Sequence, residues 1–89
     1  MPILRIEHPV PDFAGWKRAF DSDPADRKGS GVRRYQVMRS VEDPNYVMID
    51  LEFDSLEEAE GLLTKMRRVW SGEGQNVMRI VDSVESREL

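Results

Sequence analysis

His8 is the only histidine in the chain, and it stands at the end of an apolar run, directly before the turn-forming sequence PVPD. An imidazole titrates near neutral pH, so a histidine at the edge of a pocket could act as a general acid or base. Strand-like alternation gives His8 the same parity as Leu4 and Ile6, and its side chain should face the same layer. The alternative is a structural role, in which the ring hydrogen-bonds a nearby loop.

Bulky side chains elsewhere in the chain could line a pocket for a flat, apolar ligand. The candidates are Trp16, Tyr35, Met66 and Trp70. Side chains of this kind at helical or strand spacing also form ordinary hydrophobic cores, and that alternative stays open. Arg39 falls on the inward parity of its predicted strand, where a guanidinium could bind a substrate carboxylate or phenolate. The alternative for Arg39 is an ion pair with Asp12, with a glutamate or with a partner chain.

Metal chemistry and a nucleophilic triad are not expected. With one histidine and no cysteine, a metal site would have to rely on carboxylates. The acidic stretch DSDPAD at residues 21–26 lacks the spacing and the glycine of a calcium-binding loop. No serine motif with a partnered base is present.

Composition limits the partners and the compartment. The net charge is −4, and the densest basic cluster (Lys65, Arg67 and Arg68) is too small for a nucleic-acid binder. No apolar run is long enough to span a membrane, and the N-terminus lacks a secretory signal. The absence of cysteine is typical of a reducing cytoplasm. We therefore expect a cytoplasmic protein without nucleic-acid or membrane partners, and 89 residues predict a single domain over 1–89.

The elements that must position these residues follow the order strand, helix, strand, strand, helix, strand. We predict strands at 3–8, 32–41, 46–53 and 77–84, and helices at 12–23 and 55–70. Asp12 is a good N-cap, and Ser55 with Glu58 forms a capping box. Each helix carries one apolar stripe. The stripe consists of Phe13, Trp16 and Phe20 in the first helix and of Leu56, Ala59, Leu62, Leu63, Met66, Val69 and Trp70 in the second. This order predicts a ferredoxin-like α+β fold, with two helices on one face of a four-stranded antiparallel sheet.

Two connections carry further expectations. Matching the apolar faces of the second and third strands predicts Val37 opposite Leu51 and Arg39 opposite Ile49, with five residues between Val41 and Val47. The polar loop at 21–31 is long for a compact domain, and loops of this length are often lids or mobile rims of sites.

The second face of the sheet would be left uncovered by the helices. It would carry a mixture of apolar and charged residues, including Ile3, Arg5, Glu7, Arg34, Gln36, Met38, Met48, Asp50 and Glu52. A monomer could leave this face in contact with water. A homodimer could pack two such faces together, and the small size of the chain favours that arrangement. We expect Asp50, opposite Gln36 or Arg34, to form an ion pair at the interface.

Several motifs extend over nearly the whole chain: Asp12, Phe13, Trp16, Lys17 and Phe20, the DPN turn at 43–45, FDSLEEAE at 53–60, and Trp70. This pattern resembles the antibiotic biosynthesis monooxygenase-like group of the dimeric α+β barrel superfamily. The resemblance implies a homodimer whose sheets join into a barrel, with a ligand cleft between the helices and the sheet of each subunit. These motifs are structural, so they specify fold more strongly than chemistry.

The resemblance also implies a reaction, namely oxygenation of an aromatic or polyketide-type small molecule without metal, flavin or other cofactor. In such enzymes the substrate anion itself reacts with oxygen, and the pocket supplies deprotonation, orientation and a dry site. His8 would then remove or hold a phenolic proton, Trp16 and Trp70 would stack on the ring, and Arg39 or Tyr35 would stabilise the anion. Haem-degrading relatives have a histidine after the second-helix tryptophan, and the stretch at 71–76 contains none.

Two other classes of function stay open. A non-catalytic dimeric ligand-binding or accessory protein would have the same cleft, and the single histidine keeps this alternative close. A regulatory module of the amino-acid-sensing type shares the order of elements, although we expect no linker or second domain. A cavity of a few hundred Å³ that touches His8 and Trp70 would favour ligand handling over a purely structural dimer.

Overall fold

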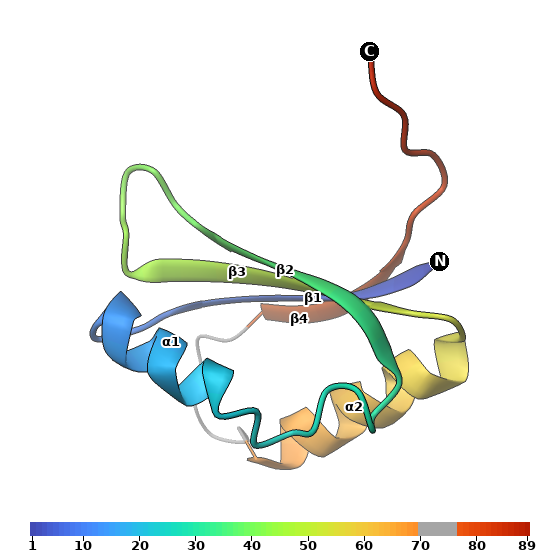
Figure 1. Ribbon diagram of the computed structural model, residues 1–89, viewed down its shortest axis with the longest axis horizontal. Coiled ribbons are helices and arrows are strands. Elements are labelled where there is room, and N and C mark those ends of the chain that lie inside the picture. Colours follow the sequence, from blue (N-terminus) through green and yellow to red (C-terminus); the bar gives the residue numbers. More distant parts are fainter. Residues whose placement is uncertain (70–76) are drawn as a thin grey trace.

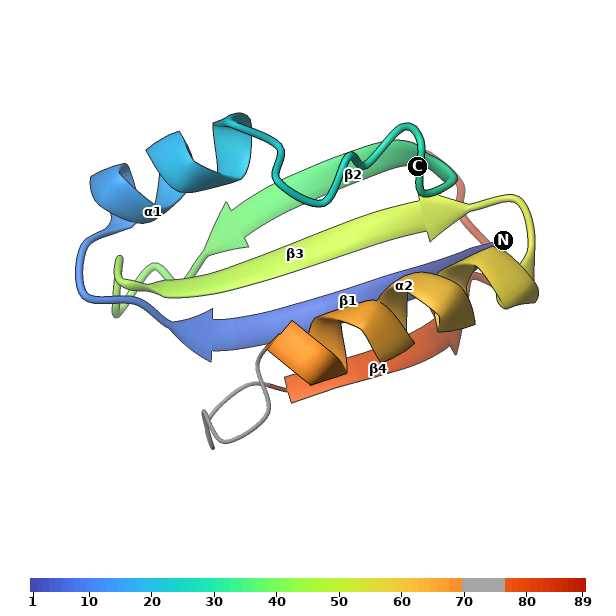
Figure 2. The same cartoon turned by 90° about the horizontal axis from the view of Figure 1, so that it is seen from below.

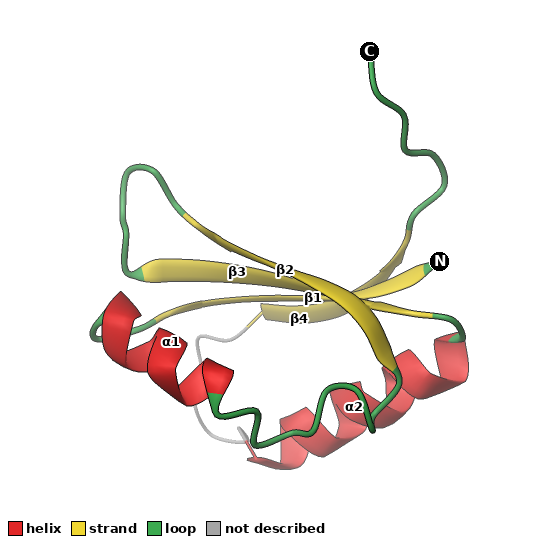
Figure 3. Cartoon of the chain, viewed as in Figure 1, coloured by secondary structure: helices red, strands yellow, loops and turns green. Residues whose placement is uncertain are grey.

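The structure is a computed structural model that describes residues 1–69 and 77–89. Its elements are β1 (Pro2–Pro9), α1 (Phe13–Asp21), β2 (Val32–Arg39), β3 (Tyr46–Phe53), α2 (Leu56–Val69) and β4 (Val77–Asp82). The strands form one antiparallel sheet in the order β2-β3-β1-β4. Both helices lie on the same side of this sheet (Figures 1 and 3), which confirms the predicted ferredoxin-like α+β fold.

The hydrophobic core lies between the sheet and α2. Alternate residues of β3, from Val47 to Phe53, are buried, and the residues between them are half-buried. These inward side chains pack with Leu4 and Ile6 of β1 and with three buried residues of α2, Ala59, Leu62 and Leu63. The predicted stripe of α2 is therefore confirmed from Ala59 to Met66, but Leu56 at its start is 54% exposed. The side chain of Val69 and the whole of Trp70 lie outside the part of the chain that the structure describes.

Both predicted helix starts are confirmed by their caps. The carboxylate of Asp12 accepts a hydrogen bond from the Gly15 amide at 2.9 Å. The Ser55 hydroxyl accepts from the Glu58 amide at 3.2 Å and lies 3.1 Å from the Glu58 carboxylate. Each cap satisfies an amide that has no partner within the helix, which sets where α1 and α2 begin.

The predicted pairing of β2 with β3 is wrong by two residues. Val37 lies opposite Ile49 rather than Leu51, and Arg39 lies opposite Val47 rather than Ile49. The ladder stops earlier because the Ser40 amide bonds the Tyr46 carbonyl and closes the turn at that point. Val41 is consequently a loop residue that is 99% exposed, not the end of a strand. A shift of two residues preserves which face each side chain occupies.

The β2–β3 turn also supports the start of α1. The Asn45 carbonyl accepts a hydrogen bond from the Val10 amide at 2.7 Å. The Asn45 side-chain oxygen accepts another from the Phe13 amide at 3.0 Å. The DPN motif therefore directs the chain from β1 into α1, and this is a structural role.

The face of the sheet opposite the helices carries ion pairs within the chain. Arg5 bonds Asp50 through two nitrogens, each at 2.8 Å, and Arg34 bonds Glu52 at 2.6 Å. The expectation that Asp50 pairs across an interface is thus corrected, because its partner is Arg5 on the neighbouring strand. These carboxylates raise the pKa of both guanidinium groups, mainly through the hydrogen bonds.

The open face has no helix over it, and residues 83–89 extend away from the sheet on this side (Figure 1). Tyr46 lies on the same face and donates a hydrogen bond to Glu7 at 3.2 Å. The pKa of Tyr46 is raised, mainly by desolvation and further by the negative charge of Glu7 and the hydrogen bond to it. Within residues 1–69 and 77–89, neither helix has the length and apolar character needed to cross a bilayer.

Candidate functional site

A cavity of about 340 Å³ lies on the helix side of the sheet. Its walls come from β1, β3, α1, α2 and the loop after α1. Within the described residues, the apolar part of the wall consists of Ile6, Ile49 and Leu51 from the sheet, Trp16, Ala19 and Phe20 from α1, Pro24 and Ala25 from the loop, and Leu62 and Met66 from α2. Protein interiors rarely leave voids larger than a water molecule, so a space of this size is a candidate ligand site.

The cavity exists because α1 does not press into the core. α1 has no buried residue, whereas α2 buries Ala59, Leu62 and Leu63. Seen from the helix side, α2 lies in front of β1 and β4, while α1 and the following loop lie towards β2 (Figure 2). The small side chains Ala19 and Ala25 face the space between them. The sheet and the two helices thus form a pocket that their own side chains do not fill.

Aromatic rings form a continuous row, of which His8, Trp16 and Phe20 line the cavity and Tyr35 lies outside it. The ring of His8 contacts Trp16 edge-on, with centroids 6.2 Å apart. Trp16 stacks on Phe20 at 5.1 Å, and Phe20 meets Tyr35 edge-on at 5.3 Å. Such rings offer flat apolar surface at little cost in side-chain entropy, which suits a planar ligand.

His8 lies at the end of β1 with one ring nitrogen towards the backbone and the other in the interior. Nδ1 is 3.1 Å from the Pro9 carbonyl oxygen, and Nε2 is buried. A carbonyl can only accept a hydrogen bond, so Nδ1 carries the hydrogen in this contact. In the neutral ring Nε2 then holds the lone pair, which makes it the atom that could accept a proton.

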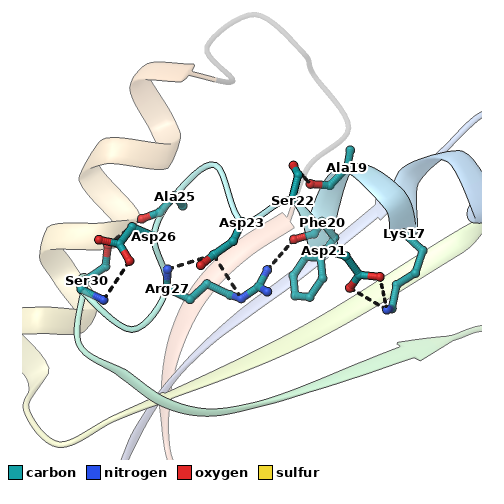
Figure 4. A network of polar contacts seen from close by, with 11 residues as sticks. Lys17, Ala19, Phe20, Asp21, Ser22, Asp23, Ala25, Asp26, Arg27 and Ser30 are labelled. Atoms are coloured by element: carbon teal, nitrogen blue, oxygen red, sulfur yellow. Dashed lines mark hydrogen bonds and ion pairs between the residues drawn. The ribbon is translucent and has the colours of Figure 1, made fainter.

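Arg27 is a cavity residue that the sequence interpretation did not identify. Its guanidinium carbon lies 3.8 Å from the Phe20 ring centroid and 4.7 Å from that of Tyr35. Nη1 donates to the Phe20 carbonyl at 2.8 Å, and Nε lies 3.4 Å from the Asp23 carboxylate (Figure 4). Arg27 therefore joins the loop to the end of α1 and contributes to the cavity wall.

The loop that carries Arg27 is folded on itself by further hydrogen bonds. The Ser30 hydroxyl donates to the Ala25 carbonyl at 2.8 Å (Figure 4), and the Asp26 carboxylate accepts from the Gly29 amide at 3.2 Å. Asp23 and Asp26 have φ values of 57° and 49°. Aspartate tolerates this left-handed conformation better than most residues do, because its side chain can bond the local backbone.

The structure brings some of the candidate residues together and leaves others apart. His8, Trp16 and Met66 line the same cavity, and Lys65 joins them from α2. Tyr35 is 46% exposed and supports Phe20 from outside the lining. Trp70 lies outside the described residues, as does the predicted loop at 71–76.

Arg39 faces the helix side of the sheet as its parity predicted, but it is exposed rather than buried. Its guanidinium carbon lies 4.5 Å from the centroid of the Phe13 ring, a cation–π contact in place of the expected ion pair. It does not line the cavity.

Across the two described stretches, no group of three or more histidine, aspartate or glutamate side chains is arranged to hold a metal ion. The ionisable side chains that line the cavity within this part of the chain are His8, Arg27 and Lys65. Arginine and lysine are protonated at neutral pH. His8 is therefore the only one of these three that could act as a base there.

Sequence comparison identifies neither a matching protein-family model nor a matching curated protein. Solved structures with this fold include a proposed antibiotic biosynthesis monooxygenase from Deinococcus radiodurans, with 16% identity and a TM-score of 0.69 over 100% of this chain and 98% of that one. A variant of SnoaB, a cofactor-independent oxygenase from Streptomyces nogalater, has 9% identity and a TM-score of 0.70, covering 96% and 93%.

A dimeric ferredoxin-like protein from an uncultured marine organism has 8% identity and a TM-score of 0.64, covering 97% of each chain. The structural neighbours are thus antibiotic biosynthesis monooxygenase-like proteins, in agreement with the resemblance inferred from the motifs. At these identities the similarity establishes the fold.

Proposed function

We propose that this protein is a small homodimeric enzyme that oxygenates an aromatic or polyketide-type molecule without a cofactor. The observation that carries the proposal is the cavity of about 340 Å³ whose wall includes His8 and Trp16, with their ring centroids 6.2 Å apart. The volume is near the lower end of the roughly 300–1,000 Å³ typical of small-molecule sites. The names of two structural neighbours, an oxygenase and a proposed monooxygenase, support the same chemistry.

In the proposed reaction, an activated CH₂ group of an anthrone-type substrate loses one proton to the imidazole of His8. The carbanion reduces dioxygen and forms a carbon–oxygen bond to it, giving a peroxide that takes up the proton. Water then leaves with the outer peroxide oxygen and the second hydrogen of that carbon, so CH₂ and O₂ become C=O and H₂O. The chain contributes a base, an aromatic wall and a site that excludes bulk water.

A non-catalytic binding or accessory protein is the second candidate. It is favoured by the lining itself, in which one base stands among apolar side chains and two protonated cations in the described residues. Such a site would hold a flat ligand whether or not any bond changes. Turnover therefore has to be measured separately from binding.

The proposed homodimer would form through the open face of the sheet. This face presents Ile3, Met38 and Met48 among paired charges, and it has no helix over it (Figure 1). Because Arg5 and Arg34 already have acidic partners within the chain, the face can approach a second copy without unpaired charge at these two positions. One structural neighbour is named as a dimer, which supports this arrangement.

The decisive experiment measures oxygen uptake with 1,8-dihydroxyanthrone as the probe and His8→Gln as the variant. We expect the unmodified protein to accelerate uptake and to release the anthraquinone. The variant should lose about 100-fold or more in kcat, because a positioned general base typically contributes that much. It should still bind 1,8-dihydroxyanthraquinone, since the aromatic wall is unchanged.

Binding without oxygen uptake by the unmodified protein would reject the enzyme in favour of the non-catalytic candidate. Full activity in the His8→Gln variant would remove His8 from the mechanism. Arg39→Gln serves as the matched control, because Arg39 lies outside the cavity and its loss should leave kcat unchanged.

A further inference from the structure

The charges around the cavity differ in sign from those of the whole chain. The protein has 17 acidic and 13 basic residues and a net charge of −4. In the described part of the lining, however, every ionisable side chain is basic: His8, Arg27 and Lys65. A pocket lined by one sign of charge and by low-dielectric walls concentrates ligands of the opposite sign.

Arg27 and Lys65 reach the cavity from different elements. Arg27 comes from the loop after α1, which runs beside β2, and Lys65 comes from α2, which lies over β1 and β4 (Figure 2). Arg27 is held at one edge by Asp23 and by the Phe20 carbonyl, so the position of its charge is fixed. Lys65 is exposed and makes no ion pair in the described part of the chain.

We propose that the cavity selects an aromatic anion, whose acidic group is held by Lys65 and Arg27 while its rings lie against Trp16 and Phe20. This inference rests on the proposed function only in assuming that an aromatic ligand enters the cavity. The ligand class is a planar acid with a carboxylate or an ionised phenol at one end. Lys65 supplies an ammonium for a charge-assisted contact, and Arg27 adds a second, fixed positive charge.

Paired probes of nearly the same shape test the charge preference. 2-Naphthoate and 2-acetonaphthone share the naphthalene rings and differ in whether the substituent is a carboxylate or a methyl ketone. We expect 2-naphthoate to bind at least about fivefold more tightly at pH 7, as measured by calorimetry. Added salt should weaken binding of the anion and leave binding of the ketone nearly unchanged.

Lys65→Gln should remove most of this preference without changing the affinity for the ketone. Arg67→Gln is the matched control, because Arg67 lies two residues further along α2, is exposed and does not line the cavity. Both variants lose one positive charge, so any effect of net charge is the same in each. Lys65 is exposed, and its replacement should not affect folding. Arg27→Gln should also reduce the preference, and its thermal unfolding is measured in parallel because Arg27 holds the loop.

The outcomes separate this inference from the proposed function. Equal affinity for both probes would overturn the charge selectivity and leave aromatic binding in place. If Lys65→Gln and Arg67→Gln lose equal affinity for 2-naphthoate, only the overall electrostatic field of the protein matters. That result would also overturn the proposal that the anion binds in the cavity. Failure of both probes to bind at millimolar concentration would reject both the inference and the aromatic ligand on which it rests.

Discussion

The guanidinium of Arg27 connects three parts of the molecule: the end of α1, the following loop and the edge strand β2. It lies over the rings of Phe20 and Tyr35, bonds the Phe20 carbonyl and forms an ion pair with Asp23. Its side chain is only 15% exposed, so these contacts are partly shielded from solvent. A planar cation with donors in fixed directions suits this position, whereas an ammonium group cannot stack in the same way.

Replacing Arg27 with lysine should therefore destabilise the protein although the charge is kept. The loss of the carbonyl hydrogen bond and of the cation–π contacts is expected to cost about 1–2 kcal/mol. Chemical unfolding of Arg27→Lys and the unmodified protein measures the difference. Lys28→Arg is the control, because Lys28 is exposed in the same loop. Equal unfolding midpoints would mean that Arg27 does not stabilise the loop.

Some residues of the site could be predicted from sequence and others could not. The directions of His8, Trp16 and Met66 follow from the periods of two for strands and 3.6 for helices, and these three residues do line the cavity. Arg27 lies in a loop, where no period fixes the direction of a side chain. Its place depends on Phe20 and on the fold of the whole loop, which leaves only a weak local signal in the sequence.

At the scale of elements, the connection between α1 and β2 ends at Gly31, whose backbone has a positive φ that favours glycine. Gly31 has φ +98°, and a Cβ at this position would meet the side chain of Glu58, which belongs to the cap of α2. The end of the loop and the start of α2 are thus packed together at a position that only glycine occupies without strain. This contact fixes where β2 begins relative to α2.

Gly31→Ala should destabilise the protein by about 1–2 kcal/mol, because an L-residue is strained at positive φ and its methyl group would displace Glu58. Gly61→Ala offers the contrasting substitution. Gly61 lies inside α2, and a methyl group there would meet no other element of the described chain within 4 Å, so alanine should stabilise the helix by about 0.5–1 kcal/mol. Thermal unfolding of both variants measures these opposite effects, and equal shifts would contradict the role assigned to Gly31.

The order and faces of the elements could be predicted, but the pairing of β2 with β3 could not be predicted in full. The alternation of β3 fixes which side chains point inward, and it is compatible with any even shift of β2. The actual register depends on the turn, in which Ser40 pairs with Tyr46. An irregularity between Val32 and Arg34 also changes the phase of β2, so that Val32 and Tyr35 face the same side. Neither feature has a strong sequence signature.

At the scale of the whole molecule, the open face of the sheet predicts association. Met48 lies on this face, between Glu7 on β1 and Met38 on β2. Met48→Arg should convert a dimer into a particle of 10.3 kDa in sedimentation experiments, because the new charge would be buried between two copies. The fold should persist, since Met48 points away from the core.

Val41→Arg is the control for this prediction, because Val41 is 99% exposed in the β2–β3 turn, outside the sheet. It should sediment like the unmodified protein. A single 10.3 kDa species for the unmodified protein at micromolar concentration would exclude the proposed dimer.

The start of β1 and the end of β4 are neighbours in the sheet, although they lie far apart in the sequence. The amide of Ser83 donates to the carbonyl of Met1 at 3.0 Å, and the terminal amine lies 3.5 Å from Asp82. Residues 84–89 could therefore be used to join the chain into a ring, which could be reopened in the exposed turn at Val41. Such a circular permutant would keep every wall of the cavity while reversing the order in which the two halves of the sheet are synthesised.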